Sequence, residues 1–273
     1  MSEPQPLREA LAAHGLLARK ALGQHFLLDL NITRKIARLA GPLDGKRVIE
    51  VGPGPGGLTR ALLEAGAKVV AIEKDPRFLP LLQDLSATFE DRLEIVLADA
   101  LAADESSLCS GAPASIVANL PYNVGTPLLI KWLTGSFRPT SMTLMFQKEV
   151  AQRISAPPGA DAYGRLAVIA QACADARIVM EIPARAFTPP PRVDSAVVRL
   201  DPLAEPPSAR RLEALQAITA AAFGQRRKML RTSLRSLGGE KLCSDAGVAP
   251  DARAETIDVA GFLRLTDTWL TGS

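Results

Sequence analysis

Short runs rich in Val, Ile and Leu alternate with stretches of helical spacing along the first part of the chain, and this alternation limits the possible folds. Strand-like runs occur at residues 47–51, 68–73, 93–97, 115–119 and 141–146. Helical stretches occur at residues 57–65, 76–85, 127–133 and 147–154. The strand-like runs are almost continuously apolar, as strands covered on both faces are. The alternation therefore predicts an α/β fold with a parallel, doubly wound sheet.

The rest of the chain departs from this alternation. Two later apolar runs, at 176–182 and 195–200, predict a hairpin at one sheet edge, which gives seven strands with a mixed end. The Pro-rich segment 201–207 then breaks the pattern. Helical spacing follows at residues 209–223, 226–237 and 259–270.

We place a domain boundary at the Pro-rich segment. The sequence thus predicts an α/β domain over residues 1–202 and a small all-helical domain over residues 203–273. The first domain includes a helical lead-in, in which residues 29–40 have the pattern of an amphipathic helix. Residues 156–163 are predicted to form an exposed, flexible loop.

The composition sets broad limits on function. The chain has 273 residues and a net charge of +3, which is compatible with a nucleic-acid partner but does not require one. Three cysteines lie far apart without a CxxC pair, and there are only two histidines, so we expect no disulfide framework and no metal site. No run approaches the ~18 apolar residues of a membrane span, and the N-terminus lacks the features of a secretory signal. We expect a cytoplasmic monomer with no membrane contact.

A glycine-rich loop, GPGPGG, follows the first predicted strand and precedes a helix. Gly52, Gly54 and Gly57 fit the pattern GxGxxG, and Glu73 stands 21 residues after Gly52, at the end of the next strand. This is the dinucleotide fingerprint, in which the acid binds the ribose hydroxyls. The same loop and acid also suit S-adenosylmethionine, which carries a ribose and an adenine but no pyrophosphate. A Gly-rich turn without a ligand is the third interpretation.

Two features favour the methyl donor. Pro53 and Pro55 have no backbone N–H, so the loop is a poor cradle for phosphate, although its glycines still allow close approach of a sugar. Asp99 follows the strand at 93–97, where its carboxylate can accept a hydrogen bond from an adenine amine. An Asp at this place is also a common helix N-cap.

The segment Asn119-Leu120-Pro121-Tyr122 ends the strand at 115–119. Ligands bind at the carboxyl ends of parallel strands, so these residues are expected beside the glycine loop. The Asn119 amide can accept from an amine, and Pro121 restricts Leu120 so that its carbonyl can point the same way. Tyr122 offers a stacking face worth about 1–3 kcal/mol to a base. The segment suits methylation of a ring amine by positioning, without a strong base. The alternative is a turn with a buried Tyr.

Six motifs occur in order over residues 22–235 and together carry a resemblance. They are LGQHFL (22–27), EVGPG (50–54), NLPYN (119–123), FQKEV (146–150), FTPPPRVDS (187–195) and FGQRRK (223–228). With these motifs the chain resembles the small-subunit ribosomal RNA adenine dimethyltransferases. The resemblance implies a Rossmann-like, seven-stranded class I S-adenosylmethionine-dependent methyltransferase fold. It also implies dimethylation of N6 of two adjacent adenines, in a hairpin loop near the 3′ end of small-subunit ribosomal RNA, and an added role in assembling immature small subunits.

The resemblance also implies site residues. Cofactor contacts are expected from His25, Leu27, Gly52, Gly54, Glu73, Asp99 and Asn119. The first two are expected to act largely through backbone groups, and Asn119 and Leu120 are expected to hold the target amine. Tyr122 and Phe187 correspond to the two aromatics that sandwich the target base. A buried core role is the alternative for Phe187.

Basic residues near the C-terminal domain form a candidate RNA contact. Arg226, Arg227 and Lys228 are followed by Arg231 and Arg235, and the spacing predicts that Arg227, Arg231 and Arg235 share one helix face. The resemblance favours contact of Arg226, Arg227, Lys228 and Arg231 with the RNA backbone, against the alternative of a solvated face.

Three other functions remain possible from the sequence. One is a dimethyltransferase acting on a single adenine of large-subunit RNA, although the segments GTPLL and FQKEVAQRI resemble the small-subunit enzymes. Another is a non-catalytic ribosome assembly factor. The third is an NAD enzyme, which the proline-bearing loop and the Asn119–Tyr122 segment disfavour.

Overall fold

The computed structural model describes residues 7–13, 15–16, 25–90, 92–225 and 227–272. Contacts divide the described chain into two compact units. The first contains described residues within 1–132, 136–151 and 178–200, and the second contains 133–135, 152–177 and those from 201 onward. The second unit thus includes a segment, 152–177, that precedes the Pro-rich region in the chain. The boundary at residue 202 stays a prediction.

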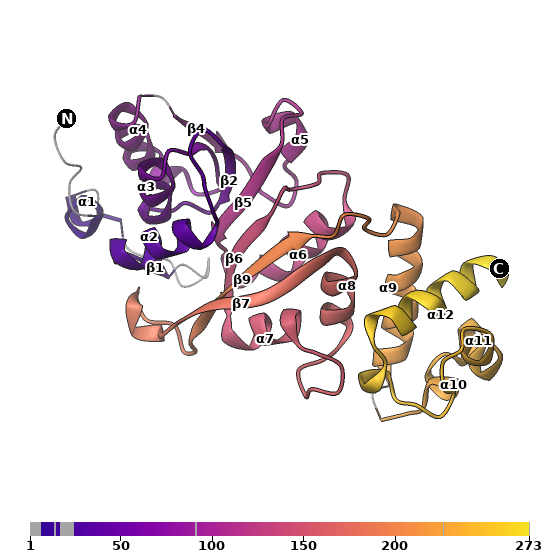
Figure 1. Ribbon diagram of the computed structural model, residues 1–273. Coiled ribbons are helices and arrows are strands. Elements are labelled where there is room, and N and C mark those ends of the chain that lie inside the picture. Colours follow the sequence, from indigo (N-terminus) through magenta and orange to yellow (C-terminus); the bar gives the residue numbers. More distant parts are fainter. Residues whose placement is uncertain (1–6, 14, 17–24, 91, 226, 273) are drawn as a thin grey trace. The chain divides into compact units, whose positions relative to one another are not determined.

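The seven-stranded sheet has the strand order β4-β3-β2-β5-β6-β9-β7 (Figure 1). The strands are β2 (Arg47–Val51), β3 (Lys68–Glu73), β4 (Leu93–Leu97), β5 (Ala114–Asn119), β6 (Met142–Gln147), β7 (Ala174–Ile182) and β9 (Ser195–Pro202). The strands from β4 to β6 pair in parallel, and β9 runs antiparallel to β6. The predicted parallel sheet with a mixed end is confirmed. The strand order reverses between β2 and β5, and ligands of such sheets bind at this point.

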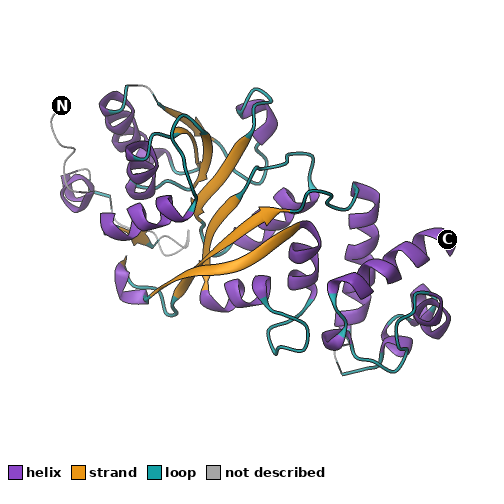
Figure 2. Ribbon diagram, viewed as in Figure 1, coloured by secondary structure: helices purple, strands orange, loops and turns teal. Residues whose placement is uncertain are grey.

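Helices cover both faces of the sheet in the first unit (Figures 1 and 2). On one side lie α2 (Leu30–Leu39), α3 (Gly57–Glu64) and α4 (Leu79–Thr88), while α6 (Gly125–Thr134) lies on the other. The first unit also contains the shorter α1 (Leu7–Ala13) and α5 (Glu105–Leu108), with a 3-10 turn, η2 (Pro76–Phe78), before α4. The boundary between the units falls within α7 (Lys148–Ser155), after Ala151. The predicted helix at 29–40 is confirmed as α2, which Asp29 caps by accepting a hydrogen bond from the N–H of Asn31.

A small second sheet, which the sequence analysis did not predict, lies beside the glycine loop. It pairs β1 (Phe26–Leu27) with β8 (Phe187–Thr188) in antiparallel register. A Cβ atom placed on Gly57 would lie 2.8 Å from the carbonyl oxygen of Leu27, so the first residue of α3 must be glycine for β1 to pack this closely. The glycine motif therefore also positions β1.

The second unit is helical. Its helices are α8 (Arg165–Cys173), α9 (Ala209–Gly224), α10 (Leu230–Ser233), α11 (Gly239–Asp245) and α12 (Val259–Gly272), with 3-10 turns η4 (Arg235–Leu237) and η5 (Ala254–Thr256). The helices predicted at 209–223 and 259–270 are confirmed as α9 and α12. No helix in the described parts of the chain is long and apolar enough to cross a membrane.

The single helix predicted over residues 226–237 is wrong. Arg227 and Lys228 lie in a turn, and helical structure resumes only at Leu230. Met229, which lies between Lys228 and Leu230, is extended, with φ −68° and ψ 153°, because it forms an antiparallel β-bridge with Arg253. This long-range pairing interrupts the helix, so the expected common face of Arg227, Arg231 and Arg235 does not form.

The loop predicted at 156–163 is exposed only in part. Residues 157–159 are exposed, but Tyr163 is buried. Its ring packs edge-on against Phe223 with a centroid distance of 6.1 Å, and its hydroxyl donates to the carbonyl of Ile257 at 2.8 Å. The end of the loop is thus anchored within the helical unit.

Candidate active site

A pocket of about 400 Å³ lies at the carboxyl ends of β2, β3, β4 and β5, where the strand order reverses. All of its lining residues belong to the first unit. The structure brings together here most of the residues predicted from the sequence. They are His25, Leu27, Gly52, Gly54, Glu73, Asp99, Asn119, Leu120 and Tyr122.

The glycine loop has no backbone donor left for phosphate between residues 52 and 56. The N–H of Gly52 donates to Ile72, and that of Gly56 donates to Pro53. The N–H of Gly54 donates to the Glu73 carboxylate at 3.0 Å. The two intervening prolines have no N–H. A pyrophosphate cradle needs free N–H groups, so this loop suits a ligand whose nearest part is not a phosphate.

The Glu73 carboxylate anchors the loop. Besides the bond from Gly54 to its Oε2, its Oε1 accepts from the N–H groups of Lys74 and Asp75, each at 2.8 Å. Burial raises the pKa of Glu73, and these three N–H groups offset part of that rise. Two carboxylate oxygens offer about four lone-pair directions, so one on Oε2 remains for a ligand hydroxyl.

Glu50 is a pocket residue that the sequence analysis did not select. It is 1% exposed, and its Oε2 has no hydrogen-bond partner among the described residues. Burial raises the pKa of Glu50 to about 8, because the neighbouring Thr59 offsets only part of the desolvation and Glu73 adds to it. The signal was present in the sequence, since an acid inside the apolar strand RVIEV has no structural reason to be buried.

Asp99 lies at the rim of the pocket, just after β4. Its Oδ1 accepts from the N–H of Leu101 at 3.0 Å, and its Oδ2 pairs with Lys74 at 2.8 Å. Lys74 and then this backbone bond hold the pKa of Asp99 below its usual range. The side chain of Lys74 is 74% exposed, so the ion pair itself contributes little, about 0–1 kcal/mol. Asp99 therefore remains available to a ligand as a charged acceptor.

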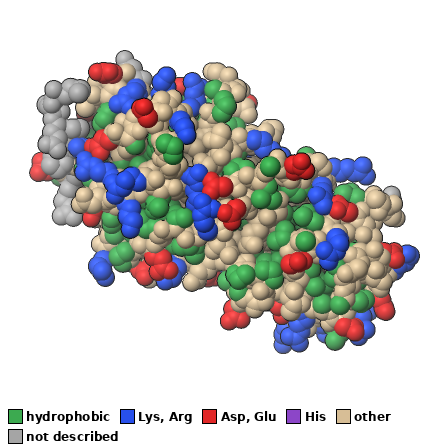
Figure 3. All heavy atoms as spheres, viewed as in Figure 1, with side chains coloured by type: hydrophobic (Ala, Val, Ile, Leu, Met, Phe, Trp, Pro, Cys, Tyr) green, Lys and Arg blue, Asp and Glu red, His purple; other side chains and the backbone are tan. Residues whose placement is uncertain are grey.

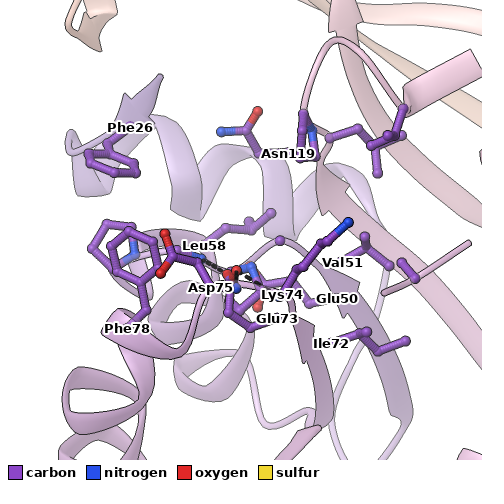
Figure 4. Close-up of a pocket in the computed structure, with 18 of the residues that line it drawn as sticks. Phe26, Glu50, Val51, Leu58, Ile72, Glu73, Lys74, Asp75, Phe78 and Asn119 are labelled. Carbon is purple, nitrogen blue, oxygen red and sulfur yellow. Dashed lines mark hydrogen bonds between the residues drawn. The ribbon is translucent and has the colours of Figure 1, made fainter. Parts of the chain in front are cut away.

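The Asn-Leu-Pro-Tyr segment forms a turn that joins β5 to α6. The carbonyl of Pro121 accepts from the N–H groups of Val124 and Gly125, each at 3.1 Å. Figure 4 shows the Asn119 amide projecting into the open space across from Glu73. It has no side-chain hydrogen bond to another described residue. A polar group presented in this way is suited to a ligand amine.

Of the two aromatic residues predicted to hold the target base, Tyr122 lines the pocket and Phe187 does not. Tyr122 stacks on His25 with a centroid distance of 5.5 Å and an interplanar angle of 28°, and its hydroxyl lies 2.7 Å from Ser195 Oγ. His25 Nδ1 lies 2.8 Å from the Pro189 carbonyl. Phe187 is 2% exposed, pairs with Leu27 and does not line the pocket in this structure. Its role in holding a base stays a prediction.

Three of the four residues predicted to contact RNA, Arg227, Lys228 and Arg231, lie in the described part of the second unit. Arg226 is outside the described residues. Arg227, Lys228 and Arg231 are exposed, and Arg231 forms an ion pair with Asp251 at 2.7 Å. No group of three or more His, Cys, Asp or Glu side chains arranged for a metal ion occurs among the described residues.

Comparison with known proteins places the chain in a family. The model of the family described as ribosomal RNA adenine dimethylase matches residues 15–269. The chain belongs to this family. It is 71% identical to "Ribosomal RNA small subunit methyltransferase A" of Phenylobacterium zucineum, over 97% of this chain and 92% of that protein. Its identity to the protein of the same name from Caulobacter vibrioides is 68%, over 94% and 99% of the two chains.

Solved structures confirm the fold expected of a ribosomal RNA adenine dimethylase. A dimethyladenosine transferase from Plasmodium falciparum aligns with a TM-score of 0.73 and 25% identity, over 88% of this chain and 96% of that one. The 23S rRNA methyltransferase ErmE aligns with a TM-score of 0.70 and 28% identity, over 89% and 98% of the two chains. The predicted class I methyltransferase fold with a helical C-terminal region is therefore confirmed.

The pocket fits the methyl donor of this dimethylase. S-adenosylmethionine is its cofactor, and it carries a positive charge on its sulfonium. The buried Glu50 carboxyl with an unpartnered oxygen suits a cationic ligand, and the Glu73 lone pair suits a ribose hydroxyl. Gly52 lies next to the Pro121 ring and has φ +68°, a backbone conformation that other residues rarely adopt, so the bend after β2 favours glycine at this position.

Glu50→Gln should change how the stability of the cofactor-free protein depends on pH. The folded pKa of Glu50, about 8, lies above the ordinary value of 4.5, so the folded state keeps a proton that the unfolded state loses. Wild-type stability relative to Glu50→Gln should therefore fall as pH rises from 4.5 to about 8. At about 1.4 kcal/mol per pKa unit, the full difference is roughly 5 kcal/mol.

The measurement is urea unfolding of both proteins at pH 5 and pH 8.5. Glu94→Gln, which removes an exposed carboxyl on β4, is the matched control. A stability difference between wild type and Glu50→Gln that does not change with pH would show that Glu50 is ionised in the folded protein.

Proposed function

We propose that this dimethylase transfers methyl groups from S-adenosylmethionine to N6 of two adjacent adenines near the 3′ end of small-subunit ribosomal RNA. The target lies in a hairpin loop, and each adenine receives two methyl groups. High identity over nearly the full length of relatives named small-subunit methyltransferases supports this choice of RNA. A loop base leaves its stack at lower cost than a paired base, which suits a target that must enter a pocket.

The Asn119 amide carries the proposal. It projects into the pocket across from Glu73 and has no side-chain hydrogen bond to another described residue, and Tyr122 lines the same pocket. An amide oxygen there accepts a hydrogen from the adenine amine, and the Leu120 carbonyl is proposed to accept the other. Two acceptors on the amine hydrogens draw the lone pair of N6 out of conjugation with the ring and aim it at the methyl group.

The remaining side chains hold the two reactants. Glu73 is proposed to bind the ribose hydroxyls, and Asp99 the adenine amine of the cofactor, which supplies the methyl group as a sulfonium. Tyr122 and Phe187 are proposed to hold the target ring, although Tyr122 faces His25 in this structure. Positioning of two reactants in line contributes up to about 7–11 kcal/mol to lowering a barrier, so these contacts supply most of the rate.

We further propose that the enzyme acts as a monomer on immature small subunits in the cytoplasm, where ribosomal RNA is modified. The decisive experiment incubates such subunits with a radiolabelled methyl donor and maps the labelled nucleotides. Label on two adjacent adenines of the small-subunit RNA is the expected result. Large-subunit RNA is incubated in parallel with the same donor: label on one of its adenines would overturn the proposal, and subunit binding without label would indicate an assembly factor.

Asn119→Ala and Tyr122→Ala should separate methylation from binding. Loss of a stacking face worth about 1–3 kcal/mol should slow Tyr122→Ala by about ten- to a hundredfold. Asn119→Ala should lose more, because it removes an acceptor at the reacting nitrogen and a cofactor contact. Both should bind immature subunits with near-normal affinity. Single-turnover methylation and subunit binding are measured on the same proteins, and a parallel loss of both would assign these residues to the fold or to RNA binding.

RNA contact is proposed for the basic residues of the second unit. On the face shown in Figure 3, Lys and Arg side chains are mixed with acidic ones, so this face has no broad basic surface. RNA contact there would depend on a local cluster of basic residues. Arg227 and Lys228 are adjacent and exposed in the turn before α10. Such residues neutralise phosphates and release counterions when RNA binds.

Replacing Arg227 or Lys228 by Ala should reduce the slope of log K against log salt for subunit binding by about 0.7–0.9. Lys241→Ala is the control, because Lys241 is also exposed in this unit and pairs with Asp245 on its own helix. Slopes equal to that of the control would show that the turn is an ordinary solvated surface.

A further inference from the structure

Lys131, on α6, makes a set of contacts that neither the fold nor the proposed chemistry has explained. Its ammonium group donates to the carbonyls of Ala100 and Ala103, at 2.8 and 2.6 Å. It also donates to Oε1 of Glu105 at 2.8 Å. An ammonium group has three N–H donors, so all three are used on one short segment, residues 100–105.

This segment contains the turn that presents Asp99 to the pocket. The carbonyl of Asp99 accepts from the N–H groups of Ala102 and Ala103, each at 3.0 Å. Its side chain accepts from Leu101 in the same turn. Ala98, Asp99 and Ala100 all line the pocket. The position of the Asp99 carboxylate is therefore set by the position of the turn as a whole.

These hydrogen bonds shape the turn internally, but its apolar side chains and its ion pair attach it only weakly to the rest of the fold. Leu97 and Leu101, on either side of Asp99, are 52% and 42% exposed. The ion pair of Asp99 with Lys74 is largely in solvent and contributes little. The contacts of Lys131 differ, because they reach a group that is almost fully buried.

Glu105 is 2% exposed, and its Oε1 accepts from Lys131 and from the indole N–H of Trp132 at 2.7 Å. Removing one partner of a buried charge pair leaves the other uncompensated, which makes such a contact costly to break. On α6, Leu128, Leu129 and Trp132 are at most 1% exposed, so the helix is a fixed part of the core. Lys131 thus attaches the turn to a rigid element.

The geometry points to Lys131 as a positioning residue for the cofactor. From α6, Lys131 holds the Asp99 turn in place, and so sets the distance between Asp99, which is proposed to bind the adenine of the cofactor, and the Asn119 end of the pocket. Helix α6 begins directly after the segment Asn119–Val124, and the carbonyl of Pro121 bonds to its first residue. One side chain therefore connects the two ends of the site. The inference rests on the proposed role of Asp99.

The test compares Lys131→Met with the double variant Lys131→Met/Glu105→Gln. The second removes the carboxylate that the first leaves uncompensated, and Gln retains an acceptor for Trp132. Lys68→Met, exposed at the start of β3, is the matched control. Both Lys131 variants should fold. The Kd of S-adenosylmethionine in calorimetry and its KM should each rise about tenfold, whereas the KM for the RNA substrate and kcat should stay within about threefold of the wild-type values.

A cycle with Asp99→Ala separates positioning from plain structural support. If Lys131 acts through the turn, adding Lys131→Met to Asp99→Ala should change the cofactor Kd less than twofold further. The inference would be overturned if the fold increases in cofactor Kd caused by the two single changes multiply in the double variant. A normal cofactor Kd in Lys131→Met would also overturn it, as would loss of the fold in both Lys131 variants. A normal Kd in Asp99→Ala alone would show instead that the proposed role of Asp99 is wrong.

Discussion

The hydrogen bond from the Gly54 N–H to the Glu73 carboxylate fixes the shape of the site on which the remaining contacts depend. It joins the loop after β2 to the end of β3 and uses the one donor that the two prolines leave in the middle of the loop. Because Glu73 is 6% exposed, a bond to its charged form is stronger than a surface contact, about 1.5–3 kcal/mol. The loop is thus held open for an uncharged sugar by the same acid that is proposed to bind that sugar.

Glu50 and Glu73 place two buried acids within one pocket, and burial raises the pKa of both. Such an arrangement is unfavourable for the empty protein, because burial penalises the charged form of each acid, and repulsion from Glu73 adds to this for Glu50. It becomes favourable when a cation enters. The two buried acids therefore lower the stability of the cofactor-free fold, and the same acids favour binding of a positively charged ligand, a combination that is common at functional sites. The clearest sign of this destabilisation is Oε2 of Glu50, which is buried without a hydrogen-bond partner among the described residues.

Sequence patterns predicted the five parallel strands β2 to β6 to within one residue, because short and mainly apolar runs that alternate with helical spacing are typical of such strands. The convergence of Asp99 and Asn119 followed from the topology alone. Three features did not follow. The strands β1 and β8 have two residues each, too few to show a period. The bridge of Met229 to Arg253 is a long-range pairing that overrides helical spacing. The ammonium of Lys131 reaches backbone carbonyls, which leave no trace in the sequence.

The proposed reacting end of the pocket, at Asn119 and Tyr122, offers acceptors rather than a strong base. The Asn119 amide is neutral at any pH, and burial raises the pKa of Tyr122, whose hydroxyl is paired with Ser195. The acids lie nearer the glycine loop, on β2 and β3. An adenine N6 that has accepted a methyl group is positively charged and loses its proton readily to water. The proton therefore needs no dedicated acceptor, and the structure can use its contacts for alignment. In the proposed mechanism, rigid attachment of both loops to the sheet and to α6 is then the main requirement for catalysis.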